Sequence, residues 1–159
     1  MTHVRTLMLL ALLSAIAAPA RADITGFLGV NTTPANRLAQ GVAVGFGLLV
    51  VGFEFEYAET SADLPTLAPS LKTGMGNVLL QVPVPVFGIQ PYFTAGGGIY
   101  KEELGAHSDT DFGLNTGGGV KVALIGPVRL RVDYRIFKLG SGALNSPAHR
   151  FYAGLNLKL

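Results

Sequence analysis

Four charged side chains alternate with apolar ones in one short segment of this chain. Residues 128–135 read V-R-L-R-V-D-Y-R, and an extended strand would place Arg129, Arg131, Asp133 and Arg135 on a single face. Where water is excluded, such charges require partners of opposite sign, because an unpaired buried charge is strongly destabilising. The pattern predicts ion pairing, with carboxylates supplied by another part of the chain.

A second alternating segment supplies such carboxylates. Residues 51–58 read V-G-F-E-F-E-Y-A, with Glu54 and Glu56 on the face opposite the aromatic residues. Lys121, which follows a glycine run, is a further candidate for the same set. Both segments alternate with a period of two, so strands rather than helices must position these side chains.

Other chemistry finds less support in the sequence. The glycine runs at 96–101 and 117–121 complete neither a dinucleotide-binding nor a phosphate-loop motif, and neither opens a helix. The chain has no cysteine and only 3 histidines, of which His107 and His149 lie beyond the first segment, so ligands for a metal are scarce. We expect no cofactor and no metal site.

The N-terminal segment has the features of an export signal. Positive charge within residues 1–5 precedes the apolar run L-M-L-L-A-L-L-S-A-I-A-A, and Ala20-Arg21-Ala22 provides the small residues that signal peptidase recognises. We predict a cleavable signal peptide at 1–22 and one exported domain at 23–159.

The charge of that domain points to a membrane. Removal of the signal peptide takes Arg5 and Arg21 from the 12 basic residues and leaves all 10 acidic ones, so the domain has no net charge. This balance argues against nucleic acid as a partner. Charged residues form 14% of the chain and the mean hydropathy is +0.43, whereas a typical soluble domain has about 25% charged residues.

Alternation of period two recurs along the whole domain. It predicts eight strands, at 24–31, 41–50, 51–58, 74–86, 91–101, 112–125, 128–137 and 151–159. Short connections at 50–51, 87–90 and 126–127 alternate with long polar ones at 31–40, 59–72, 102–111 and 138–149. This arrangement predicts an all-β fold, an eight-stranded antiparallel up-and-down transmembrane β-barrel with its long loops outside the cell.

A soluble barrel would show the same period with its faces exchanged. The residue types on the polar face distinguish a soluble barrel from a transmembrane one. In the second, fourth and fifth predicted strands these are mostly Gly, Ala, Thr, Asn and Gln, which are too bland for an exterior in water. Aromatic residues near the strand ends fit two interfacial girdles: Tyr57, Tyr100, Phe112 and Phe151 near the long loops, and Phe53, Phe87 and Phe93 near the short turns. We expect the apolar face to contact lipid.

In such a barrel the third and seventh strands lie opposite each other across a lumen only wide enough for side chains. Glu54 and Arg131 each lie three residues from a short turn, and at about 3.3 Å per residue both reach about 10 Å from the rim. Glycines on intervening strands leave room for long side chains: Gly41, Gly45, Gly47, Gly113, Gly117 and Gly119. We predict that Glu54, Glu56, Lys121, Arg129, Arg131, Asp133 and Arg135 form an ionic network that closes the lumen; separate hydration of these charges in a wet pore is the alternative.

Several stretches resemble the OmpA-like and Opa-like family of small bacterial outer-membrane β-barrels. They are N-T-G-G-G-V-K-V, T-A-G-G-G-I-Y, G-P-V-R-L-R-V-D-Y-R-I-F and the closing R-F-Y-A-G-L-N-L-K-L, and the resemblance extends over the exported domain. It implies the outer membrane of a Gram-negative cell, contact with outer-membrane lipid and lipopolysaccharide, and insertion by the outer-membrane assembly machinery. Leu159 departs from the terminal aromatic residue that is usual in the family.

Barrels that deacylate lipid A place a His, a Ser and an acidic residue near the outer rim, so two sets of residues are candidates for this chemistry. His107, Ser108 and Asp109 are sequence neighbours and cannot converge as a triad. His149 with Ser146 and Asp109 would require two loops to meet. We expect solvated loop residues and no catalytic residue.

The sequence predicts a small, monomeric, non-catalytic outer-membrane barrel with a structural or surface-interaction role and a lumen closed by the ionic network. Two alternatives stay open. One is an outer-membrane lipid-modifying enzyme, and the other is a narrow channel or small-ligand carrier.

Overall fold

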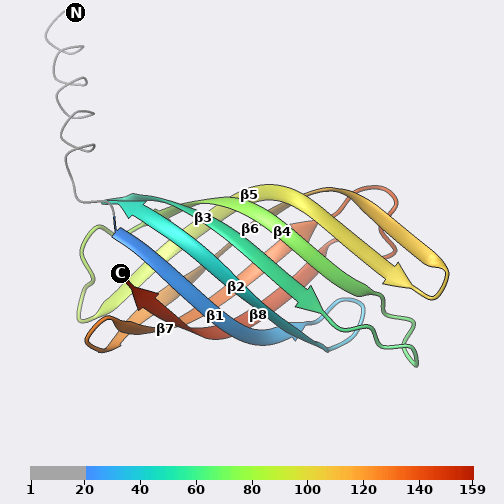
Figure 1. The fold of residues 1–159 in the computed structure, drawn as a ribbon, viewed down its shortest axis with the longest axis horizontal. Coiled ribbons are helices and arrows are strands. Elements are labelled where there is room, and N and C mark those ends of the chain that lie inside the picture. Colours follow the sequence, from blue (N-terminus) through green and yellow to red (C-terminus); the bar gives the residue numbers. More distant parts are fainter. Residues whose placement is uncertain (1–20) are drawn as a thin grey trace, which may run out of the picture.

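The computed structural model describes residues 21–159, so the predicted signal peptide lies outside the described residues apart from its last two positions. Eight antiparallel strands form a closed barrel in sequence order (Figure 1), and β1 pairs with β8. The strands are β1 (Arg21–Asn31), β2 (Arg37–Leu48), β3 (Val51–Thr60), β4 (Ser70–Gln81), β5 (Ile89–Leu104), β6 (His107–Ile125), β7 (Val128–Lys138) and β8 (Ala148–Lys158). The predicted eight-stranded antiparallel barrel is therefore confirmed. Within residues 21–159 no helix is long and apolar enough to cross a membrane.

The connections gather by type at the two ends of the barrel (Figure 1). Residues 49–50, 82–88 and 126–127 form the turns at one end, which we call the turn end. Residues 32–36, 61–69, 105–106 and 139–147 form the connections at the other, the loop end. Gly88 and Gly126 have φ of 78° and 56°, so these two tight turns use a conformation that glycine adopts without strain.

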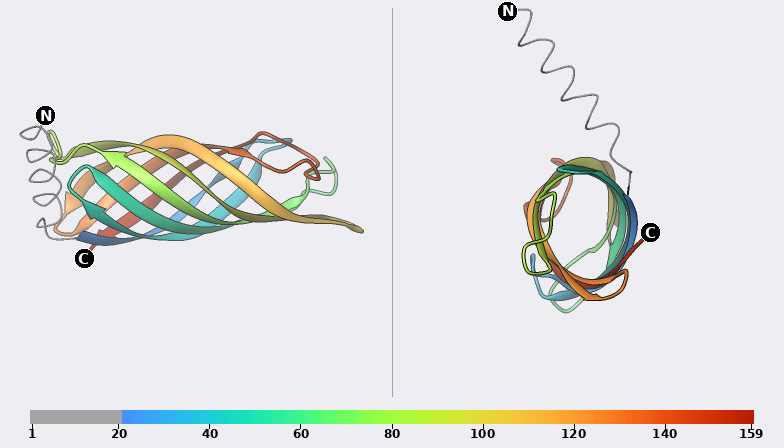
Figure 2. Two further views of the ribbon diagram at one scale, coloured as in Figure 1. Left: turned by 90° about the horizontal axis from the view of Figure 1, so that it is seen from above. Right: turned by 90° about the vertical axis from the view of Figure 1, so that its left-hand side faces the viewer.

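Most strands begin or end a few residues away from their expected limits, and two of these differences change the connections. β4 ends at Gln81 rather than at residue 86, because Pro83 and Pro85 lack the N–H group that a ladder requires. The expected long loop at 102–111 is instead a hairpin of paired strands, since β5 and β6 continue to a turn at Gly105 and Ala106. This hairpin projects beyond the other connections of the loop end (Figure 2).

The apolar face of the strands forms the outer wall. Phe55, Phe112 and Leu155, on three different strands, are 61%, 58% and 60% exposed. An apolar surface of this extent is unfavourable in water and suits the hydrocarbon layer of a membrane. Outward charges occur at the loop end in exposed ion pairs, Glu59–Lys72 and Lys101–Glu103. The expected orientation of the two faces is confirmed.

Side chains fill the lumen. Near the loop end lies a buried apolar cluster of Leu71, Met75, Tyr100, Phe137, Leu139 and Ala148. The assignment of Tyr100 to an interfacial girdle was wrong, because its position in the alternation of β5 turns the ring inward, where it is 0% exposed. The middle of the lumen, next to this apolar cluster, is filled by the charged residues of β3 and β7.

The glycine run of β6 makes room for those charged residues. A Cβ at Gly119 would collide with the carbonyl of Val132 and would lie 2.6 Å from the hydroxyl of Tyr92. At Gly117 a Cβ would collide with the carbonyl of Tyr134. These glycines let β6 approach β7 closely while long side chains from β5 and β7 occupy the lumen.

Candidate functional site

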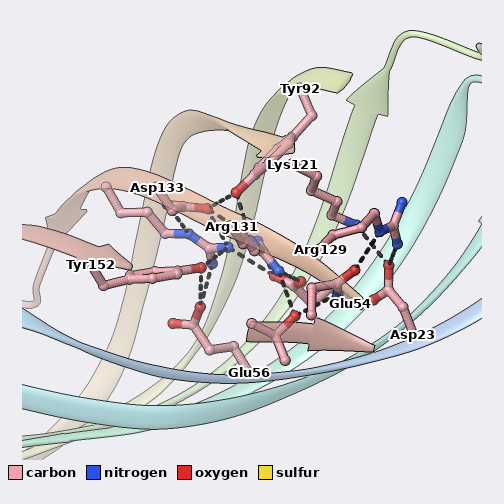
Figure 3. A network of polar contacts seen from close by, with 12 residues as sticks. Asp23, Glu54, Glu56, Tyr92, Lys121, Arg129, Arg131, Asp133 and Tyr152 are labelled. Carbon is pink, nitrogen blue, oxygen red and sulfur yellow. Dashed lines mark hydrogen bonds and ion pairs between the residues drawn. The ribbon is translucent and has the colours of Figure 1, made fainter. Parts of the chain in front are cut away.

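Arg131 and Arg135 of β7 hold the carboxylate of Glu54, which reaches them from β3 on the opposite wall. Figure 3 shows Glu54 directed toward Arg131. Arg131 donates from Nη1 to Oε2 and from Nη2 to Oε1, the latter at 3.2 Å, and Arg135 Nη2 donates to Oε1 at 2.8 Å. The three side chains are at most 1% exposed. Two-pronged donation by a guanidinium fits the geometry of a carboxylate and is among the stronger polar contacts in proteins.

Asp133 lies between the two arginines on β7 and separates their charges. Its carboxylate accepts from Arg131 Nη2 at 3.1 Å and from Arg135 Nε at 3.0 Å. Tyr92 of β5 donates its hydroxyl to Asp133 and accepts from Arg131 Nε at 2.7 Å. Side chains from three strands therefore meet at one point of the lumen.

Glu56 forms the side of this network nearer the loop end. Its carboxylate pairs with Arg135 Nη1 at 3.1 Å and with Arg150 Nη1 at 2.8 Å. Arg150 also donates to the hydroxyl of Thr73 at 3.0 Å, and its guanidinium lies 4.3 Å from the ring centre of Phe137. This cation–π contact joins the network to the apolar cluster.

We call these six residues the central ionic layer: Glu54, Glu56, Arg131, Asp133, Arg135 and Arg150. Its three arginines face three carboxylates, and the six side chains are 0–1% exposed. Equal numbers of opposite charges keep the layer neutral, and the attraction between paired groups offsets the large desolvation penalty of burying each charge. With the apolar cluster beside it, the layer fills the middle of the barrel.

A second group of charges lies nearer the turn end. Asp23 of β1 accepts from Lys121 Nζ at 2.7 Å and from Arg129 Nη2 at 3.1 Å. Arg129 also donates to Asn156 at 2.8 Å and to Gln90 at 3.1 Å. We call Asp23, Lys121 and Arg129 the turn-end cluster.

The seven predicted network residues thus divide between two groups. Glu54, Glu56, Arg131, Asp133 and Arg135 meet in the central ionic layer, and Lys121 and Arg129 lie in the turn-end cluster. The sequence interpretation missed Asp23 and Arg150, which lie one residue before the first and eighth predicted strands. Extending the alternation by one residue at each of these starts would have placed both in the lumen.

Three of the candidates for lipid A chemistry have hydrogen-bond partners outside the candidate triads. His149 Nδ1 lies 2.7 Å from the hydroxyl of Tyr134, Ser146 Oγ accepts from the amide of Leu139 at 3.1 Å, and Asp109 accepts from Tyr100 at 2.6 Å. No hydrogen bond joins His149, Ser146 and Asp109 to one another among these contacts. Among residues 21–159 there is no group of three or more His, Cys, Asp or Glu that could hold a metal.

The fold is similar to those of solved outer-membrane β-barrels. No protein-family model and no curated protein sequence matches the chain. Neisserial surface protein A is 18% identical with a TM-score of 0.66, over 88% of this chain and 96% of the other. The N-terminal β-barrel domain of Pseudomonas aeruginosa OprF is 14% identical with a TM-score of 0.66, over 87% and 97%. The outer-membrane enzyme PagL is 11% identical with a TM-score of 0.56, over 86% and 99%.

The closed barrel, its apolar wall and its filled lumen define a small transmembrane β-barrel of the outer-membrane class. A barrel that closes on itself leaves no unpaired strand edge in lipid, and its wall presents apolar side chains to the hydrocarbon. The bacterial outer membrane is the location that fits this class of fold.

Proposed function

We propose that this protein is a non-catalytic outer-membrane barrel of the OmpA-like and Opa-like kind that works through its loop end and does not conduct ions. The observation that carries the proposal is the central ionic layer, which spans the lumen from Glu54 on β3 to Arg131 on β7 with both side chains at most 1% exposed. A conducting pore of this kind would need hydrated charges along its axis. Here the charges are paired with one another and shielded from water.

The loop end is suited to contact with other molecules because hydrogen bonds tie its connections to one another. Arg37 donates to the carbonyl of Thr33 at 2.6 Å and to that of Ser61 at 3.4 Å, which ties two loops together. Glu102 accepts from the amide of Leu144 at 2.7 Å and so ties the β5–β6 hairpin to residues 139–147. A pre-formed surface loses little conformational entropy on binding.

The outward ion pairs of the same end suit the polar face of the membrane. Glu59–Lys72 and Lys101–Glu103 lie where the apolar wall gives way to loops, at the level expected for lipid head groups. Outer-membrane lipid and lipopolysaccharide are the surroundings that we propose for this rim, with the assembly machinery as the inserting partner and a monomer as the working form.

The alternative of a lipid-modifying enzyme draws on the likeness to PagL. His149 would be its base, but the group that it contacts is the phenol of Tyr134, a poor nucleophile at neutral pH. Turnover of lipid A or phospholipid by the purified protein, lost in His149→Ala, would favour the enzyme and count against our proposal.

Conductance across a planar bilayer tests the central claim. We expect no steady current from the wild-type protein, because the lumen is filled. Glu54→Ala combined with Arg131→Ala removes the pair that spans the lumen and is expected to admit water and transient openings. A steady ohmic conductance of the wild type would contradict the proposal and support the channel.

The biological role of the loop end needs a separate test. A strain that lacks the protein is compared with one that carries it for envelope permeability, lipid composition and adhesion to host or abiotic surfaces. We expect altered adhesion with unchanged permeability, and an altered permeability alone would favour the channel.

A further inference from the structure

A cavity of about 230 Å³ opens at the turn end of the lumen. Apart from Glu54, its polar lining comes from Asp23, Gln81, Gln90, Lys121, Arg129 and Lys158, which belong to six different strands. Residues of the turns, among them Leu49 and the segment 83–85, form its mouth. We call this cavity the turn-end pocket.

The pocket is closed on the side that faces the middle of the barrel. Glu54 is part of its lining, and that carboxylate is held by Arg131 and Arg135 in the central ionic layer. A small molecule that enters from the turn end therefore meets a floor of paired side chains. This shape belongs to a binding site rather than to a section of a channel.

The side chains of the pocket carry an excess of positive charge. The arginines and carboxylates of the central ionic layer balance one another, so Glu54 does not contribute to this excess. In the remaining lining, Asp23 is the one carboxylate among the described residues, and the two cations Lys121 and Arg129 share it. Positive charge that lines a narrow cavity focuses the electrostatic potential and attracts anions.

These two cations already converge on one oxygen. Lys121 Nζ lies 2.7 Å and Arg129 Nη2 3.1 Å from the same atom, Oδ2 of Asp23 (Figure 3). Lys121 is 4% exposed and Arg129 is held by Gln90 and Asn156, so both cations keep their positions. The arrangement marks the place where a second anionic oxygen would be stabilised.

We propose that the turn-end pocket binds a small anion with a phosphate or carboxylate group, held by Lys121 and Arg129 beside Asp23. The group enters from the turn end, and its charge offsets the excess of the pocket. The inference does not depend on a role of the loop end, because the pocket and the loops lie at opposite ends of the barrel. Two sources offer this chemistry: a free anion, and the head group of a lipid at the adjoining membrane surface.

A titration that follows the two cations directly tests the proposal. The purified protein in uncharged maltoside micelles receives inorganic phosphate at constant ionic strength, kept with sodium chloride, while NMR follows the side-chain nitrogen signals of Lys121 and Arg129. We expect a saturable shift of both signals. Shifts that follow ionic strength and not phosphate would overturn the proposal.

Matched variants show where the phosphate binds. Lys121→Met keeps the length of the side chain and removes its charge, and we expect phosphate to bind about tenfold more weakly, the effect of losing one charge-assisted hydrogen bond. Lys101→Met makes the same change at the loop end, outside the barrel, and is expected to leave the affinity unchanged. Equal affinities of the two variants would overturn the proposal.

A third variant keeps the test informative if Lys121→Met does not fold, which its migration before and after boiling reveals. Asp23→Asn retains an acceptor for Lys121 and removes the competing charge, so phosphate should bind more tightly than to the wild type. Unchanged or weaker binding by folded Asp23→Asn would count against the site.

A second titration, with a short-chain phosphatidic acid in the same micelles, distinguishes a free anion from a lipid head group. A saturable shift with the lipid alone assigns the lipid head group, and a shift with inorganic phosphate as well assigns a free anion. A response to neither ligand would overturn the proposal.

Discussion

Glu54 illustrates how the stability of this barrel depends on a single buried carboxylate. Two arginines donate to its carboxylate, and neither has access to water there. The net stabilisation from a buried ion pair is small, because desolvation offsets attraction. The loss of one partner is strongly destabilising, since it leaves the others charged and unpaired.

A double-mutant cycle measures this coupling. We expect Glu54→Ala to lower the free energy of unfolding by about 3–5 kcal/mol and Arg131→Ala to do the same, because each leaves uncompensated buried charge. The double mutant should lose less than the sum of the two. Urea unfolding in lipid or detergent gives the values, and additive losses would show that the two groups are hydrated independently.

An exposed pair provides the control for that cycle. Glu59 and Lys72 lie 3.7 Å apart at the loop end, with side chains 41% and 48% exposed. Such pairs contribute about 0–1 kcal/mol. Glu59→Ala should therefore change the stability of the barrel far less than Glu54→Ala.

At the scale of elements, β6 is shaped by what its neighbours place in the lumen. Its glycines let the carbonyls of β7 approach closely, and Tyr92 of β5 lies over Gly119 on its way to Asp133. The strand has little side-chain contact of its own in the lumen at this level. Its sequence is thus constrained by residues on β5 and β7.

Substitution of this glycine tests the constraint. Gly119→Ala should lower the free energy of unfolding by about 1–3 kcal/mol, because the added methyl group overpacks against Val132 and Tyr92. Gly26→Ala on the outer wall is the matched control, since nothing lies within 4 Å of the added atom. Equal effects in urea unfolding would show that strand conformation, not packing in the lumen, explains the glycine.

The loop end differs between its elements in how firmly the backbone is held. The β5–β6 hairpin is paired up to its two-residue turn, whereas residues 61–69 expose Leu64 and Leu67 at 67% and 71%. Within residues 61–69 a single bridge, between Asp63 and Ala68, replaces the continuous ladder of the hairpin. Exposed loop tips of this kind are where proteases cut.

Proteolysis of intact cells should therefore cut in 61–69 or 139–147 before the β5–β6 hairpin. Mass spectrometry of the fragments identifies the first cut. Primary cleavage at Gly126–Pro127 in intact cells would mean that the turn end faces outside.

At the scale of the whole molecule, closure of the ladder between β1 and β8 joins the two ends of the described chain. Nine residue pairs connect these strands, from Asp23 with Lys158 to Asn31 with Arg150. A closed ladder has no edge at which unfolding can begin, so barrels of this kind resist detergent at room temperature.

We expect the protein to migrate faster on a denaturing gel before boiling than after it, because the compact barrel survives the detergent. It should also stay with membranes in alkaline carbonate. Recovery of the folded protein from the soluble periplasmic fraction would falsify the assignment to a membrane.

The sequence by itself determined the period, the faces and the number of strands. A two-residue repeat needs no tertiary contact to be visible, and the composition of its polar face was enough to turn the apolar side toward lipid. The sequence also predicted the level of two residues along the barrel axis. Glu54 and Arg131 lie at equal distances from their turns, and they meet across the lumen.

Only the tertiary structure decided which charges share a partner. Lys121 and Arg129 follow the alternation of their strands as Arg131 does, but strand stagger brings them to Asp23 rather than to Glu54. Asp23 and Arg150 lie at strand starts, where a local pattern is weakest and where pairing with a neighbour extends the strand. Closure of the barrel sets stagger and strand limits together, because every strand must pair on both sides, and no single segment carries that information.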